Sequence, residues 1–113
     1  MQAADLDTRQ VVWTHRQRAP TASSVLDTAG GVVFAGSVDR RFSAYDAANG
    51  TVLWDTPVAA SPSSSPITYT AGGAQYVAVA VGGGGAYDSD GQALMAEAAA
   101  PAAGVTMMVY QLP

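Results

Sequence analysis

The sequence has no cysteine and no lysine, and it has only one histidine, His15. Without cysteine there can be no disulfide, thiolate metal site or thiol nucleophile. All five basic side chains are arginines, and the net charge of −4 leaves no basic surface for nucleic acid or an anionic membrane. Charged residues make up 12% of the chain and hydrophobic residues 49%. This balance is typical of a folded domain, not of a disordered tail.

Long hydrophobic runs are also missing. No segment approaches the roughly 18 apolar residues that a membrane helix needs, so no membrane span is expected. Residues 1–5 show neither the basic nor the hydrophobic part of a signal peptide. What the chain does have is glycine, β-branched residues and prolines placed between short apolar runs, a pattern that predicts an all-β protein.

A repeat of about 40 residues runs through the chain. The same spacing of alanine, aspartate and tryptophan occurs twice, with a shift of 41 residues. The repeated positions, which we expect to dock neighbouring repeats on one another, are Ala3, Asp5, Trp13, Ala44, Asp46, Gly50 and Trp54. Pro20 and Ser23 align with Pro62 and Ser65. A period of this length built from short strands is the signature of a β-propeller blade with four antiparallel strands.

Alternation and turn residues place the strands. They are expected at 2–5, 11–15, 24–28, 32–36, 41–46, 51–56, 66–70, 75–81 and 105–112. Glycines at 30–31 and 72–73, and Asn49-Gly50, suit the positive φ angles of tight hairpins. Arg9 stands where the second copy has Gly50, so the first hairpin must use another turn or tolerate strain. Asp5 and Asp46 are expected to cap these turns.

The strand count predicts about two and a half antiparallel blades, an incomplete ring. Residues 1–18 would end one blade, 19–57 would form a complete blade, and 58–113 would form a last blade with an irregular insertion at 83–104. Residues 92–100 have helix-forming composition. The last blade lacks a fourth strand, and blades bury both faces against neighbours. We therefore expect further blades from a longer chain or from other copies.

Several short patterns resemble parts of ligand-binding or catalytic motifs, but each lacks the neighbouring residues that the complete motif needs. Gly82–Gly85 has no following lysine and no strand–loop–helix setting, which argues against a phosphate site. Asp88, Asp90 and Glu97 lack the spacing of an EF-hand loop. His15 has no nucleophile or carboxylate in the same motif, so it is predicted to be a surface or blade-edge residue. The methionines Met95, Met107 and Met108 are predicted to fill the core.

The segment Ala44–Trp54 resembles the tryptophan-docking motif of PQQ-dependent (quinoprotein) alcohol and glucose dehydrogenases. Residues 28–37, 66–69, 75–79 and 109–113 resemble the final stretch of those enzymes. In that family the indole packs over the neighbouring blade's copy of the motif. The closing blade there takes its fourth strand from the enzyme's own N-terminus, which would account for the strand missing here.

The resemblance implies a function for the complete enzyme: oxidation of small alcohols or sugars with PQQ and Ca²⁺ on the propeller axis, in the periplasm. The catalytic base comes from an earlier blade, so this segment is expected to supply no catalytic residue and no metal ligand, and to hold neither cofactor alone. Connections 37–40, 57–65 and 82–104 would face the cofactor. The loop Gly84, Gly85, Ala86 and Tyr87 matches the family's loop near the substrate mouth.

Two other functions fit the same repeat. A non-catalytic propeller of PQQ-type repeats could serve as a protein-binding scaffold. A short protein could also complete a ring by assembling several copies. The segments 66–69 and 75–79 favour the dehydrogenase, because they resemble its final blade and not blades in general. The isolated chain is expected to show no dehydrogenase turnover.

Overall fold

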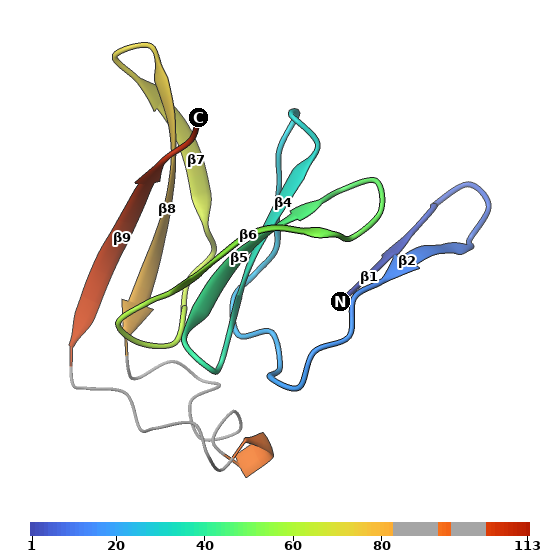
Figure 1. Cartoon of the computed structure of the whole chain (residues 1–113), viewed down its shortest axis with the longest axis horizontal. Coiled ribbons are helices and arrows are strands. Elements are labelled where there is room, and N and C mark those ends of the chain that lie inside the picture. The colour runs from blue at the N-terminus through green and yellow to red at the C-terminus, as the bar shows by residue number, and fades with distance from the viewer. Residues whose placement is uncertain (83–92, 96–103) are drawn as a thin grey trace.

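The computed structural model describes residues 1–82, 93–95 and 104–113 (Figure 1). Within these residues the chain forms short strands joined in antiparallel pairs. In chain order they are β1 (Gln2–Ala4), β2 (Val11–Thr14), β3 (Leu26–Asp27), β4 (Val32–Ser37), β5 (Arg41–Asp46), β6 (Val52–Pro57), β7 (Ile67–Ala71), β8 (Ala74–Gly82) and β9 (Val105–Gln111). The all-β prediction is confirmed, and β3 is the strand that is clearly shorter than expected.

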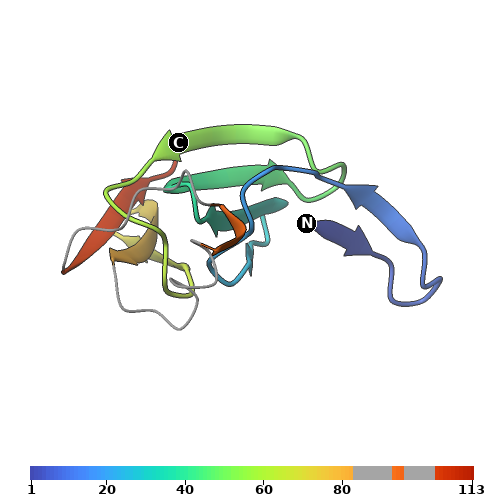
Figure 2. The ribbon, with the colours of Figure 1, turned by 90° about the horizontal axis from the view of Figure 1, so that it is seen from below.

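The strands form three sheets that fan out in chain order (Figure 1). The first sheet is β1–β2, the second is β3–β4–β5–β6, and the third is β7–β8–β9. Seen from below, the second sheet is stacked from β6 through β5 to β4 (Figure 2). Each sheet is a meander of sequential neighbours, as in propeller blades, and the fan does not close into a ring.

The repeat is visible in matching backbone contacts at the start of two blades. Thr21 bridges to Ser37 in the second blade, and Pro62 bridges to Val81 in the third. The Ser24 and Ser65 hydroxyls, 41 residues apart, hydrogen-bond to each other at 3.0 Å. The structural equivalent of Pro62 is therefore Thr21. The sequence alignment of Pro20 with Pro62 was wrong by one residue, because it matched the two prolines by residue type and the backbone register differs by one.

The second and third sheets pack through an apolar interface. Alternate side chains of β4 and β5, Phe34 and Phe42 among them, meet Val77, Val79 and Val81 of β8. These five side chains are almost completely buried. Because alternate residues of a strand point to opposite faces, each sheet commits one face to this contact. Burial of this apolar surface is the main force holding the two sheets together.

The first and second sheets meet through a smaller apolar cluster. Val33, Ala35 and Tyr45 are buried there, and Met1 and Ala47 pack at the edge of the group. The interface between these sheets therefore depends more on polar contacts than the interface between the second and third sheets.

The outer face of the third sheet is apolar and exposed. This outer face consists of Ile67, Tyr69, Val105, Met107 and Val109. The strand register places them on the side of the sheet opposite the side that packs on the second sheet. Their exposed fractions range from 41% to 69%. Such a patch is typical of an interaction surface.

The three methionines predicted to fill the core differ in their surroundings. Met95 is half-buried and lines a pocket with residues that include His15 and Asp55. Met108 is half-buried against the core, as predicted. The prediction for Met107 was wrong: its side chain is 60% exposed, because neighbouring residues of a strand face opposite sides and only Met108 faces the core.

Part of the predicted insertion lies outside the described residues. This applies to Gly84, Gly85, Ala86 and Tyr87, and to the acidic residues Asp88, Asp90 and Glu97. Of the predicted helix, residues 93–95 are described; residues 93 and 94 are helical and residue 95 is not. In the described part of the chain, no helix is long and apolar enough to cross a membrane.

Candidate functional site

Two hairpin turns carry the repeated aspartates, and their backbones match. The carboxylate of Asp5 accepts hydrogen bonds from the amides of Asp7 and Thr8, at 2.9 and 2.8 Å. The carboxylate of Asp46 accepts one from the amide of Ala48, at 2.8 Å. The turn-capping role predicted for the two aspartates is confirmed. The two backbone amide bonds to Asp5 lower its pKa, because they favour the charged carboxylate.

Trp13, at the end of the first sheet, is seated on the turn of the second. Its indole Nε1 donates a 2.8 Å hydrogen bond to the carbonyl oxygen of Ala47. The six-membered ring lies over Gly50, so closely that a β-carbon there would overlap it. Gly50 also has φ +74°, a conformation that side chains disfavour. Both requirements explain glycine at this position.

Trp54, the second copy of this tryptophan, has different surroundings. Its ring meets that of Tyr110 edge to face at 4.9 Å and that of Phe42 at 6.2 Å. It remains 37% exposed. A groove of about 580 Å³ lies beside it, lined by residues that include Phe34, Trp54, Tyr110 and Leu112. The indole therefore borders an open apolar groove, whereas Trp13 is covered by a turn.

Tyr45 and Tyr110 occupy equivalent positions, since Tyr45 pairs with Val33 and Tyr110 with Val77. The Tyr45 hydroxyl is 3.2 Å from Oε1 of Gln17, to which it donates. The Tyr110 hydroxyl is buried and has no hydrogen-bond partner among the described residues. Burial raises the pKa of both phenols, because it disfavours the charged form.

A polar network covers the rest of the second sheet's face toward the first. Asp55 accepts hydrogen bonds from Nε of Arg41 at 2.7 Å and from Oγ of Ser43 at 2.8 Å. The bond from Arg41 is the main reason that the pKa of Asp55 is lowered. The ring of His15 meets that of Tyr45 at 4.9 Å. His15 is half-buried at a blade edge, as predicted.

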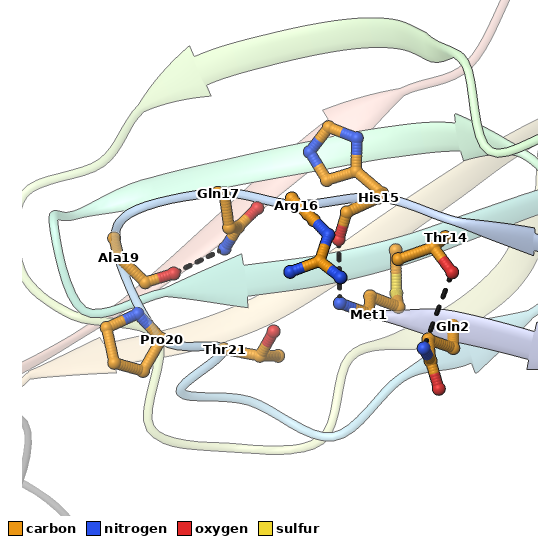
Figure 3. Close-up of a pocket in the computed structure, with 9 residues that line it drawn as sticks. All are labelled: Met1, Gln2, Thr14, His15, Arg16, Gln17, Ala19, Pro20 and Thr21. Atoms are coloured by element: carbon orange, nitrogen blue, oxygen red, sulfur yellow. Dashed lines mark hydrogen bonds between the residues drawn. The ribbon is translucent and has the colours of Figure 1, made fainter.

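A polar pocket of about 380 Å³ lies where the chain passes from β2 toward β3 (Figure 3). Its rim is held by hydrogen bonds from the amino group of Met1 to the His15 carbonyl, 2.9 Å, and from Gln17 Nε2 to the Ala19 carbonyl, 2.7 Å. Arg16 and Thr21 also line it. The pocket offers hydrogen-bonding groups, and none of its residues forms a nucleophile–base pair.

Sequence reasoning identified the docking positions, Trp13 and Gly50 among them, but missed the acceptor of the indole hydrogen bond. The acceptor is the backbone carbonyl of Ala47. Every residue has such a carbonyl, so the residue type at position 47 does not identify it as the acceptor. The pairing of Arg41 with Asp55 depends on the β5–β6 register, since the partners are 14 residues apart. Among the described residues there is no group of three or more His, Asp or Glu side chains that could hold a metal ion.

The sheets are meanders of up to four strands that fan out side by side. A tryptophan of the first sheet packs on a turn of the second. These features define the protein as part of a β-propeller. The family model for the β-propeller domain of glucose, ethanol and alcohol dehydrogenases matches residues 1–77. The chain belongs to this family of PQQ propellers.

Curated relatives match the whole chain or about two thirds of it. It is 40% identical over 114 residues to the quinoprotein ethanol dehydrogenase of Pseudomonas putida, covering 100% of this chain and 18% of that protein. It is 43% identical over 76 residues to the 1-butanol dehydrogenase (cytochrome c) of Thauera butanivorans, covering 67% of this chain and 11% of that protein. The chain thus spans less than a fifth of the length of these relatives.

Solved structures agree. The quinohemoprotein alcohol dehydrogenase from Comamonas testosteroni is 40% identical and superposes with a TM-score of 0.71, covering 77% of this chain and 13% of that one. A europium-containing methanol dehydrogenase is 28% identical with a TM-score of 0.77, covering 96% of this chain and 22% of that one.

Proposed function

We propose that this chain is the C-terminal part of the propeller of a PQQ-dependent alcohol dehydrogenase. The observation that carries the proposal is the match along the whole chain to an enzyme named for ethanol. Another matched relative is named for 1-butanol, which favours alcohols over sugars. In this proposal residues 1–18 end one blade, 19–57 form a complete blade and 58–113 form the last one. The seven repeated positions, from Ala3 to Trp54, dock these blades.

The end of β9 supports a fourth strand supplied by another segment. The register makes Gln111 the equivalent of Asp46, since they pair with Tyr76 and Val32 at the start of the second strand in each blade. Pro113 then stands where Ala48 stands. Ala48 donates its amide to the Asp46 carboxylate, and proline has no amide hydrogen. The aspartate cap of the second blade's turn therefore has no counterpart here, which supports a β9 that does not turn back into its own fourth strand.

The end of the fan that holds the β2–β3, β4–β5 and β6–β7 connections is proposed to face the cofactor. These connections lie together at the lower end in Figure 1. PQQ and Ca²⁺ would be bound there by the complete enzyme, with the ligands and the catalytic base supplied by earlier blades. PQQ would supply the oxidising chemistry, and this chain would form wall and loops. Gly84, Gly85, Ala86 and Tyr87 are proposed to border the substrate mouth. The complete enzyme is proposed to act in the periplasm.

A chimera tests this proposal. The 114-residue segment of the Pseudomonas putida ethanol dehydrogenase that matches this chain is replaced by residues 1–113. Dye reduction is measured with PQQ and Ca²⁺, using ethanol, 1-butanol and glucose as substrates. We expect activity with the alcohols, and none from the isolated chain or from the host without the segment. A chimera that folds but oxidises no alcohol would contradict the proposal.

A further inference from the structure

The first hairpin carries an arginine in a turn that elsewhere requires glycine. Arg9 donates its amide to the Asp5 carbonyl at 2.8 Å, just as Gly50 does to Asp46. The amide of Asp5 bonds to Gln10 at 2.9 Å, as that of Asp46 does to Thr51 at 2.8 Å. Arg9 has φ 57°, in the left-handed region, and Gly50 has φ 74°. The first hairpin therefore keeps the turn and tolerates the strain.

Nothing within the described residues compensates for this strain. Arg9 is exposed, and its guanidinium has no hydrogen bond or ion pair in the described part of the chain. Its neighbour Leu6, which occupies the place of Ala47, is 92% exposed. A non-glycine residue held in a left-handed conformation is a hint of function when no local contact explains it.

The equivalent turn shows what packs at this position. The Trp13 indole occupies the space into which a β-carbon of Gly50 would project, and its Nε1 bonds to the Ala47 carbonyl. On the first hairpin that space belongs to the Arg9 side chain. An indole cannot sit there as Trp13 does on Gly50. It can approach only from further out, where its face meets the guanidinium plane, a favourable arrangement for arginine and an aromatic ring.

We propose that Arg9 forms a cationic seat for the tryptophan of the repeat that packs ahead of this chain. At that junction, a stack of indole on guanidinium replaces the stack of indole on glycine seen at Trp13 and Gly50. This inference rests on the proposed function, which requires a blade ahead of Met1. In this proposal, Arg9 determines which preceding blade can pack on the first hairpin.

Substitutions in the chimera test the seat, with a host whose preceding repeat has tryptophan at the position of Trp13. Arg9→Met keeps the side-chain stem and the left-handed strain but removes the guanidinium, and it should lower the urea midpoint of unfolding. Arg9→Lys keeps the charge without the planar group and should give an intermediate midpoint. Arg40→Met is the control, because Arg40 is the other left-handed arginine (φ 62°), and it should leave the midpoint unchanged.

A second pair of variants transplants the seat to a junction whose tryptophan is described. Gly50→Arg and Gly50→Met both introduce strain and overlap with Trp13. If guanidinium can seat an indole, Gly50→Arg should unfold at higher urea than Gly50→Met. Equal midpoints for this pair, or an Arg9→Met chimera as stable as the parent, would overturn the inference.

The outcomes separate the two proposals. Missing PQQ-dependent activity together with the expected order of midpoints would contradict the proposed function alone. An active chimera that is indifferent to Arg9→Met would contradict the cationic seat alone. A chimera without a cooperative unfolding transition would contradict both, because both require blades that pack ahead of Met1.

Discussion

The indole of Trp13 lies so close over Gly50 that a β-carbon at Gly50 would overlap the ring. This pair joins two repeats that are otherwise held by few apolar residues, Val33, Ala35 and Tyr45. The hydrogen bond from Trp13 to the Ala47 carbonyl fixes the orientation of the ring. The junction between the first and second sheets therefore depends on the Trp13 side chain and on glycine, which has no side chain, at position 50.

Gly50→Ala is expected to destabilise the fold more than Gly72→Ala. Both glycines have positive φ, 74° and 56°, so alanine at either position should cost about 1 kcal/mol of unfolding free energy. A β-carbon at Gly72 meets nothing within 4 Å, whereas one at Gly50 overlaps Trp13. That overlap should cost about 1–3 kcal/mol more. Urea unfolding of both variants checks the difference, and equal losses would show that Trp13 does not pack on Gly50.

Tyr45→Phe should lower stability, whereas Tyr110→Phe should not. Tyr45→Phe removes the hydroxyl that bonds to Gln17 and should cost about 1 kcal/mol. Tyr110→Phe removes a buried hydroxyl without a partner among the described residues, so it should be neutral or stabilise by about 1 kcal/mol. Thermal or urea unfolding of the pair is sufficient. A clear loss of stability for Tyr110→Phe would mean that its hydroxyl has a partner in solution.

The network around Asp55 should make stability depend on acid pH. Arg41 and Ser43 lower the pKa of Asp55 below its ordinary value of 3.8, so the folded state favours the carboxylate. Its contribution is complete above that value and is lost as pH falls through the lower folded pKa. Because the side chains of the ion pair are 41% and 35% exposed, screening limits the effect to less than about 1 kcal/mol.

Urea unfolding at pH 6 and pH 3 tests this dependence. Asp55→Asn should lose less stability than the parent between the two pH values, because its side chain does not titrate. Asp27→Asn, which changes an exposed aspartate at the end of β3, is the matched control. A parent and an Asp55→Asn variant with the same pH dependence would exclude Asp55 as the responsible group.

The sequence was sufficient for the strands and for the repeat, because alternation, turn glycines and the tryptophan spacing are local signals. It was not sufficient where two registers look alike. Pro20 and Pro62 aligned by residue type, while the backbone pairs Thr21 with Ser37 and Pro62 with Val81. It also could not tell which of Met107 and Met108 faces the core, because a shift of one residue reverses the face.

The docking partner of Trp13 is a further example. The repeat and the family resemblance indicate that the Trp13 ring packs on the next copy of the motif, but they do not indicate which atoms of that turn it contacts. The acceptor, the Ala47 carbonyl, is backbone and carries no residue signature. Such contacts depend on how two blades pack against each other. The conformational preferences of the residues along each strand do not determine that packing.

We expect the outer face of the third sheet to be a packing surface that another blade covers. Sedimentation velocity of the isolated chain tests it most directly, with Met107→Lys and Val109→Lys as variants that place charge on that face. We expect the parent chain to self-associate and the variants to sediment as smaller species. A parent chain that stays monomeric at high concentration, unaffected by either substitution, would contradict the claim.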